Sequence, residues 1–142
     1  MRLIYNFLVY VVIILSPLII IYRIFKEKEN PKRFLEKFSI YKEKRKEGKL
    51  IWFHCSSVGE FLSIVPLIQE FEKVKKINQI LVTTSTLSSS KIFEKYRFKK
   101  TFHQFYPLDN IHLVNNFLNY WRPSSVFFVE SEIWPTMISE LN

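Results

Sequence analysis

The sequence predicts an α/β protein in which an N-terminal apolar helix precedes a Rossmann-like parallel sheet with helices on both faces. Three observations support this fold class. Residues 3–22 contain no charged side chain. After Gly48, short apolar segments alternate with segments whose apolar residues recur every three or four positions, which is typical of alternating strands and helices. The predicted strands are apolar throughout, as expected where helices cover both faces of a sheet.

The uncharged run is long enough to cross a membrane. Its twenty residues, at about 1.5 Å each, span about 30 Å, which is the thickness of the hydrocarbon core of a bilayer. Residues 1–22 are therefore predicted to form a membrane anchor. A cleaved signal peptide is one alternative, although Met1 and Arg2 would be its whole n-region and no small-residue cleavage site follows. A buried core helix is the other, and the length of the uncharged run argues against it.

Residues 23–49 carry most of the charge of the chain. They contain eleven Lys or Arg and five Glu, which gives +6 of the formal net charge of +8. We interpret them as a basic helical linker at the membrane surface, where each nearby cation contributes about 1 kcal/mol of attraction to anionic lipids. A solvated charged helix is the alternative. The positive-inside rule places residues from Arg23 onward in the cytoplasm, and the nearly neutral remainder argues against a nucleic-acid-binding face.

Residues 50–142 are predicted to form the Rossmann-like domain. A strand at 50–55 is followed by a helix with Phe61, Ile64 and Ile68 at helical spacing, in which Pro66 is expected to cause a kink or mark a restart. The elements expected next, in order, are a strand at 79–84, a helix at 88–96, a weaker strand at 101–106, a helix at 111–121, a strand at 125–130 and a helix from about residue 134.

Polar residues follow the predicted strands where a parallel sheet binds ligands, beyond the carboxyl ends of its strands. The four strand ends read "HCSSVGE", "TTSTLSSS", "YPLDN" and "VESEIWP". In the first, Ser57-x-x-Glu60 fits a capping box at a helix start, with Gly59 permitting close packing. The alternative is a site in which small residues, among them Ser56, let an anionic ligand approach the helix N-terminus and Glu60 acts as a base.

The other strand ends give weaker signals. Thr84, Thr86 and Ser88 fit helix caps, or hydroxyls presented to a phosphate or sugar. Glu130 and Glu132 fit surface acids, or carboxylates that a buried strand delivers to the sheet edge. The spacing of the histidines and acids makes no metal motif.

His54 and Cys55 do not predict a nucleophilic pair. Adjacent residues in a strand face opposite ways. Cys55 is the sole cysteine of the sequence, so an internal disulfide is impossible. "CSSVG" lacks the first glycine of a nucleophile elbow, and no Walker lysine motif is present.

Taken together, these motifs resemble a known family. "HCSSVGEFLSIVPLI", "LVTTSTLSSS", "YPLDN" and "VESEIWPTMI" occur in the order and spacing of the 3-deoxy-D-manno-octulosonic acid (Kdo) transferases of lipopolysaccharide synthesis, which have a GT-B fold. "KRFLEKFSIY", residues 32–41, is similar to the segment that joins the membrane anchor of that family to its first domain. The resemblance covers essentially the whole chain.

The resemblance implies a glycosyltransferase at the bacterial inner membrane, on its cytoplasmic side, where it also meets anionic lipids. Such an enzyme moves Kdo from the donor CMP-Kdo to a lipid A precursor (lipid IVA) with inversion, and needs no metal or cofactor. It implies that Glu60 is the general base and that Glu130 is also functional. The candidate substrate-binding residues are Ser56, Ser57, Gly59, Thr84, Thr86, Ser88 and Glu132.

Two departures from the family pattern qualify these expectations. The family usually has T-T-x-T-x-T-G after the second strand, where this chain has Ser88 and Ser89 in the last two places and lacks the conformational freedom of glycine. The sequence also stops within the helix after Pro135, so the half that binds the CMP-sugar is absent. The chain alone is therefore expected to bind acceptor without transferring sugar. Alternatives are a non-catalytic, membrane-tethered glycolipid-binding module, a degenerate remnant, or a GT-B enzyme with another donor.

Overall fold

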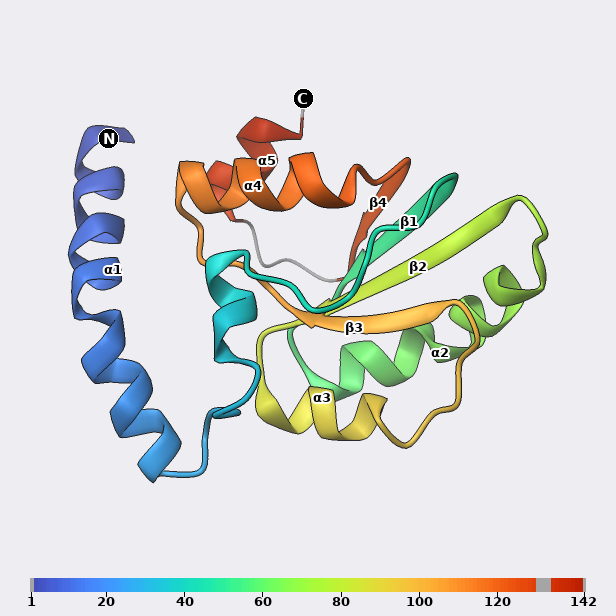
Figure 1. Ribbon diagram of the computed structural model, residues 1–142, viewed down its shortest axis with the longest axis horizontal. Coiled ribbons are helices and arrows are strands. Elements are labelled where there is room, and N and C mark those ends of the chain that lie inside the picture. Colours follow the sequence, from blue (N-terminus) through green and yellow to red (C-terminus); the bar gives the residue numbers. More distant parts are fainter. Residues whose placement is uncertain (1, 130–133, 142) are drawn as a thin grey trace.

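A four-stranded parallel sheet forms the centre of the domain. The computed structural model describes residues 2–129 and 134–141, and its strand order is β3–β2–β1–β4. The strands are β1 (Lys49–His54), β2 (Ile77–Thr84), β3 (Thr101–Phe105) and β4 (Ser125–Phe128). The helices of the domain are α2 (Val58–Lys73), α3 (Leu87–Phe93), α4 (Ile111–Trp121) and α5 (Pro135–Glu140). Figure 1 shows α2 and α3 on one face and α4 and α5 on the other, which confirms the predicted fold class.

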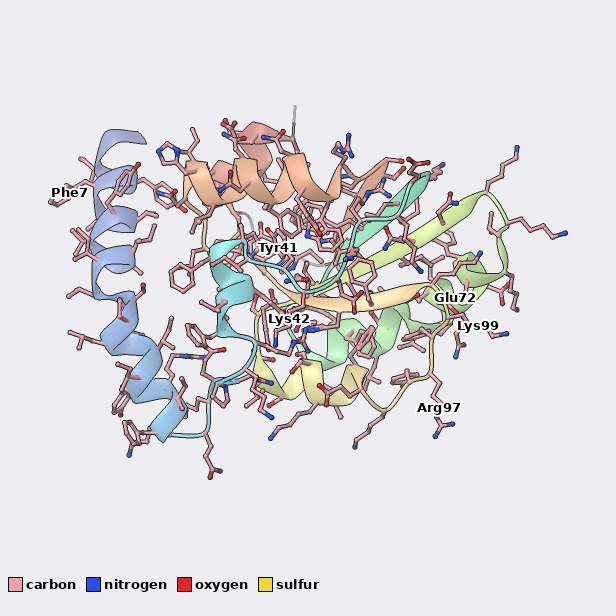
Figure 2. All side chains as sticks on the ribbon, viewed as in Figure 1. Phe7, Tyr41, Lys42, Glu72, Arg97 and Lys99 are labelled. Atoms are coloured by element: carbon pink, nitrogen blue, oxygen red, sulfur yellow. The ribbon has the colours of Figure 1, made fainter. Side chains whose placement is uncertain are left out.

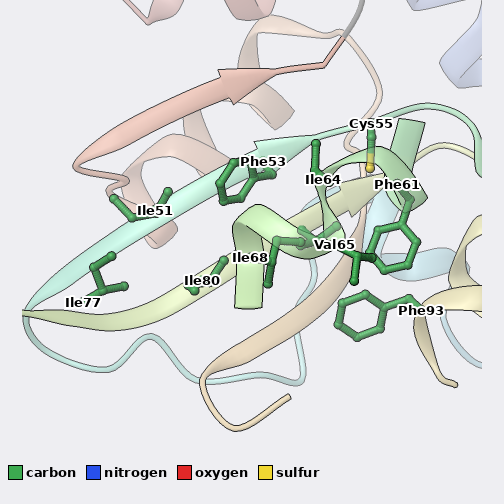
Figure 3. Close-up of a cluster of buried hydrophobic side chains, with 11 residues drawn as sticks. Ile51, Phe53, Cys55, Phe61, Ile64, Val65, Ile68, Ile77, Ile80 and Phe93 are labelled. Carbon is green, nitrogen blue, oxygen red and sulfur yellow. The ribbon is translucent and has the colours of Figure 1, made fainter. Parts of the chain in front are cut away.

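The alternation of side chains along β1 explains why both sheet faces are apolar. Ile51, Phe53 and Cys55 point into a buried cluster that α2 and α3 cover, as Figure 3 shows. Leu50 and Trp52 point the other way, into a cluster that α4 and α5 cover. Because successive side chains of a strand lie on opposite faces, an unbroken apolar run supplies both clusters.

One predicted strand is less buried than expected. Phe127 in β4 is 42% exposed, although its ring stacks on Phe53 with the ring centroids 5.1 Å apart. The reason is position: β4 lies at the edge of the described sheet, beside β1 alone. The expectation that both faces of this strand are buried is therefore wrong for Phe127.

The helix after β1 shows no restart at Pro66. α2 continues from Val58 to Lys73, and Phe61, Ile64, Val65 and Ile68 all face the core as the spacing predicts. Pro66 lies on the exposed side of the helix. A proline there omits one backbone hydrogen bond without displacing any core side chain.

The linker is not the helix that the sequence suggested. Between the end of the first helix and β1, the structure contains a short 3-10 helix, η1 (Phe34–Phe38), within turns and bends. The prediction of a helical linker over residues 23–49 is therefore wrong for most of its length. Tertiary contacts explain the difference, because Arg33 and Lys37 form ion pairs with Glu36 and Glu29 that fold this segment onto itself and onto β3.

The N-terminal apolar run forms one long helix, α1 (Arg2–Phe25), which lies beside the domain near the carboxyl edge of the sheet (Figure 1). Its segment Phe7–Phe25 is long and apolar enough to cross a membrane. Most of its surface is exposed, and Phe7 projects away from the domain in Figure 2. The inward side is held by a hydrogen bond from the Tyr5 hydroxyl to Asp109.

Candidate functional site

The carboxyl ends of β1, β2 and β3 meet at one edge of the sheet because all three strands are parallel. The predicted clusters that begin at Ser56 and Thr84 are in direct contact there. The Ser89 hydroxyl donates to the Ser56 carbonyl over 3.5 Å and lies 2.7 Å from the Thr86 hydroxyl. The starts of α2 and α3 therefore lie side by side at this edge. Glu130 and Glu132 lie outside the described residues, so their proposed roles stay predictions.

Glu60 is held by the start of its own helix. Its carboxylate accepts hydrogen bonds from the Ser56 backbone N–H at 2.6 Å and from the Ser57 hydroxyl at 2.8 Å. The Ser57 hydroxyl in turn accepts from the Glu60 backbone N–H at 3.2 Å and caps α2. This is the predicted reciprocal cap, with Ser56 supplying an amide to the carboxylate. Each carboxylate oxygen keeps a further lone pair, so a held Glu60 can still accept a proton or a hydrogen bond.

Gly59 leaves space beside Glu60. A Cβ atom added at Gly59 meets no heavy atom within 4 Å, and Gly59 is not among the residues with positive φ. The close-packing explanation for this glycine is therefore wrong. The open space agrees with the alternative interpretation of the sequence, in which a small residue lets a ligand approach the start of α2.

The threonines of the second strand end have different surroundings. Thr84 is fully buried, and its hydroxyl lies 2.8 Å from Nε2 of the buried His103. Thr86 caps α3 by accepting from the Ser89 backbone N–H at 3.2 Å. Ser88 is exposed in the first turn of α3. Of these three residues, Thr86 and Ser88 are accessible from solvent.

His54 and Cys55 face opposite clusters, as predicted. The His54 ring lies 4.0 Å from the Tyr106 ring, centroid to centroid, and its Nδ1 lies 2.9 Å from the Thr83 hydroxyl. Burial lowers the pKa of His54 to about 4, against the opposing effects of a Thr83 hydrogen bond and the Glu60 charge. Burial raises the pKa of the Cys55 thiol to about 12, with a contribution from Glu60. A buried neutral thiol is a poor nucleophile, so this pair serves packing.

Asp109 is a structural residue of the site edge that sequence analysis did not single out. Its carboxylate accepts from the backbone N–H groups of Thr136 at 3.0 Å and Met137 at 2.9 Å, and from the Tyr5 hydroxyl. It therefore joins α1 to the start of α5. The sequence offered two signals. Asp109 is the sole aspartate of the chain and lies in "YPLDN", and Pro135 marks the start of a later helix.

Two buried carboxylates in the linker also escaped sequence analysis. Glu36 accepts from Arg33 at 2.7 Å and from the Phe105 backbone N–H at 2.9 Å, while Arg33 also donates to the His103 carbonyl at 2.8 Å. The other, Glu29, pairs with Arg23 and Lys37. Part of the basic charge of residues 23–49 is thus used inside the protein. Among the described residues, no group of three or more His, Cys, Asp or Glu side chains is arranged to hold a metal ion.

The parallel sheet and its polar carboxyl edge define the class: an α/β domain of the kind that binds ligands beyond its strand ends. The family model of 3-deoxy-D-manno-octulosonic-acid transferase (kdotransferase) matches residues 32–142. The chain therefore belongs to the Kdo transferase family, as a glycosyltransferase domain, and the resemblance seen in its motifs is confirmed.

Individual relatives agree with the family assignment. The 3-deoxy-D-manno-octulosonic acid transferase of Rickettsia bellii is 38% identical over 136 residues, which cover 96% of this chain and 32% of the relative. The probable mitochondrial 3-deoxy-D-manno-octulosonic acid transferase of Arabidopsis thaliana is 36% identical over 126 residues, covering 87% of this chain and 28% of the relative. A bifunctional glycosyltransferase/methyltransferase of Fusobacterium nucleatum is 32% identical over 117 residues, which cover 81% of this chain and 18% of the relative. The chain thus spans about a third of the length of the first two relatives.

Proposed function

We propose that this chain is the acceptor-binding part of a Kdo transferase and that Glu60 is its general base. The observation that carries the proposal is the Glu60 carboxylate, fixed by Ser56 and Ser57 next to the open space at Gly59. A side chain held in one orientation at an accessible edge is a positioned base. Family membership supports a glycosyltransferase reaction with Kdo.

In the proposed reaction, a hydroxyl group of the lipid A precursor (lipid IVA) attacks the anomeric carbon of Kdo in CMP-Kdo. A bond forms between the hydroxyl oxygen and this carbon while the bond from the carbon to the phosphate oxygen of CMP breaks. CMP leaves with the bonding electrons, the anomeric configuration inverts, and Glu60 takes the hydroxyl proton. General-base assistance of this kind contributes about 10²–10⁴-fold to a rate. In this proposal the chain supplies acceptor binding, and it spans about a third of the length of the Rickettsia bellii relative.

The proposed location is the cytoplasmic side of a bacterial inner membrane. Support comes from α1, whose outer side exposes large apolar side chains that lipid can cover, and from the excess of basic residues that follows it. A phosphorylated glycolipid in the inner leaflet would then meet the sheet edge directly. Exposed cations of residues 23–49, among them Lys26 and Lys28, are available to anionic lipids. In this proposal Glu130 also acts on the substrates, and Ser88, Thr86 and Glu132 help to bind them.

The proposal is tested with two assays. The chain itself is titrated with lipid IVA in detergent, where we expect saturable binding. Transfer is then measured in a chimera in which this chain replaces the matching region of the Rickettsia bellii relative. In the chimera, Glu60→Gln should lower transfer by about 10²–10⁴-fold and leave acceptor binding within about threefold, because the amide keeps the shape but cannot accept the proton.

The matched control is Glu70→Gln, which changes an exposed carboxylate further along α2, where it pairs only with Lys73 among the described residues. It should leave both assays unchanged. Near-normal transfer by the Glu60→Gln chimera would remove Glu60 from the mechanism. Absence of acceptor binding by the chain would overturn its assignment as the acceptor-binding part.

A further inference from the structure

A cavity of about 400 Å³ lies between α1 and the carboxyl edge of the sheet. This volume is within the range of about 300–1,000 Å³ that is usual for small-molecule sites. One wall is the inward side of α1, including Val12, Ser16 and Ile20, and the opposite wall includes Leu108 and Trp134. The cavity is separate from the Glu60 cluster, because none of the residues around it belongs to the start of α2.

The walls of the cavity are mostly apolar, but they include two buried hydrogen-bond donors. The Ser85 hydroxyl and the Trp134 indole N–H line it, are buried, and have no hydrogen-bond partner among the described residues. Both can donate to a carbonyl oxygen. An apolar cavity with two buried donors is suited to an alkyl chain that begins at an ester or amide carbonyl, since unpaired buried donors are costly.

Charged groups come from the end of α1 and from the linker. Glu29 is 3% exposed and accepts from Arg23 at 3.2 Å and from Lys37 at 2.6 Å, and all three residues line the cavity. Two cations and one carboxylate leave a local excess of one positive charge. This excess complements a phosphorylated headgroup rather than a neutral or cationic one.

The position of the cavity provides a route for a lipid. α1 forms one of its walls, and the outer surface of this helix exposes large apolar side chains such as Phe7, Ile14 and Leu18, which are 68%, 75% and 68% exposed. Such a helix surface is stable in lipid. At the other side, Ser85 follows β2, the strand next to β1, whose end leads to Glu60.

We propose that this cavity is an acyl-chain subsite for the phosphorylated glycolipid acceptor. One acyl chain lies between α1 and Leu108, its carbonyl accepts from Ser85 and Trp134, and the excess positive charge at Arg23 and Lys37 faces a phosphate. The inference rests on the proposed function, because it names the part of the acceptor that this region binds. It assigns α1 a role in substrate recognition in addition to anchoring.

The test uses lipid IVA with a photoreactive diazirine at the end of one acyl chain, bound to the 142-residue chain in phosphatidylcholine vesicles. Crosslinked peptides are identified by mass spectrometry. We expect labelling on both walls, in the peptides that contain Ile20 and Leu108. Unlabelled lipid IVA should compete, and phosphatidylglycerol with chains of the same length should not.

Two variants fill the cavity from opposite walls, Ile20→Trp and Leu108→Trp. Each should lower labelling by about tenfold, because the chain loses its buried position. The control Ile14→Trp changes an exposed residue of the same helix and should leave labelling unchanged. Circular dichroism and the urea midpoint show whether each variant is folded, and two variants from different walls keep the test decisive if one fails to fold.

Three outcomes would overturn the inference: unchanged labelling in both filled variants, equal competition by phosphatidylglycerol, or crosslinks mainly between two protein chains. The Glu60→Gln variant separates this inference from the proposed function. It should lose transfer in the chimera and keep full labelling of the cavity. If Glu60 proves essential while the filled variants label normally, only the acyl-chain subsite is wrong.

Discussion

At the residue scale, the two glycines of the chain lack side chains for different reasons. Gly48 has φ of +95°, and an added Cβ would lie 2.2 Å from the Asn78 side-chain oxygen. Gly59 has open space around it. Gly48 is required by its positive φ and by the close approach of Asn78. No contact within the described residues requires a glycine at position 59.

Substituting each glycine by alanine should therefore give opposite results. Gly59→Ala is expected to raise the free energy of unfolding by up to about 1 kcal/mol, because alanine favours a helix. It should also lower transfer by the chimera, because the methyl group occupies the approach to Glu60. Gly48→Ala should cost about 1–2 kcal/mol through its positive φ and its clash with Asn78. Urea unfolding and the transfer assay measure both effects, and full activity in Gly59→Ala would show that no substrate approaches there.

Two buried histidines make the protein sensitive to acid. Burial lowers the pKa of His54 from 6.5 to about 4, and burial and the nearby Arg33 lower that of His103 well below its usual value. Below about pH 6.5 the unfolded chain binds protons that the folded chain does not, so stability falls as the pH falls toward the folded pKa. At about pH 5 the loss from His54 is about 2 kcal/mol, and His103 adds to it in the same direction.

Urea unfolding at several pH values between about 7 and 5 measures this loss. His54→Asn should reduce the pH slope even though it also removes the contact with Thr83. A free energy of unfolding that stays constant over this range would contradict the assignment.

At the scale of elements, one carboxylate connects the end of α2 to the start of β3. Glu72 accepts from the backbone N–H groups of Lys99, Lys100 and Thr101 at 2.8–3.1 Å and from the Thr101 hydroxyl at 2.8 Å. Figure 2 shows Glu72 next to Lys99. Burial raises the pKa of Glu72, but these hydrogen bonds outweigh burial and leave the pKa below its usual value.

Glu72→Ala should therefore destabilise the fold by about 2 kcal/mol, because it leaves several donors without their charged acceptor. Glu70→Ala changes an exposed carboxylate two positions earlier, loses only an ion pair with Lys73 and should change stability by less than about 0.5 kcal/mol. Chemical unfolding of the two variants side by side provides the measurement. Equal effects would show that the Glu72 hydrogen bonds do not contribute to stability.

At the scale of the whole molecule, α1 contacts the domain near its first turn and the linker after its last. Tyr5 donates to Asp109 near the first turn, and Arg23 pairs with Glu29 after the last. The helix is therefore a wall of the domain as well as an apolar surface. Its buried share is small, however, and its outer side exposes many large apolar side chains.

Deletion of residues 1–22 should release most of the protein from membranes, because it removes nearly all of this apolar surface. The measurement is the fraction that sediments with vesicles containing anionic lipid. Tyr5→Phe, which removes one hydrogen bond and keeps the apolar length, is the control and should still sediment. Unchanged sedimentation of the deleted protein would show that another surface binds the membrane.

The sequence by itself determined the order of elements and the cap that holds Glu60. Both depend on neighbours in the chain: apolar periodicity distinguishes strands from helices, and Ser57 and Glu60 are one helical turn apart. The same locality explains why the apolar helix and the strands beginning near Lys49 and Thr101 could be predicted close to their observed bounds.

Only the tertiary structure decided what surrounds these elements. The burial of Glu29 and Glu36, the contact of Asp109 with Tyr5 and the exposure of Phe127 all depend on segments that meet after the chain has folded. A charged residue and its distant partner have no fixed spacing in the sequence, so a periodic pattern cannot pair them. For the same reason, the open space at Gly59 and the cavity beside α1 became visible only when helices and strands were packed together.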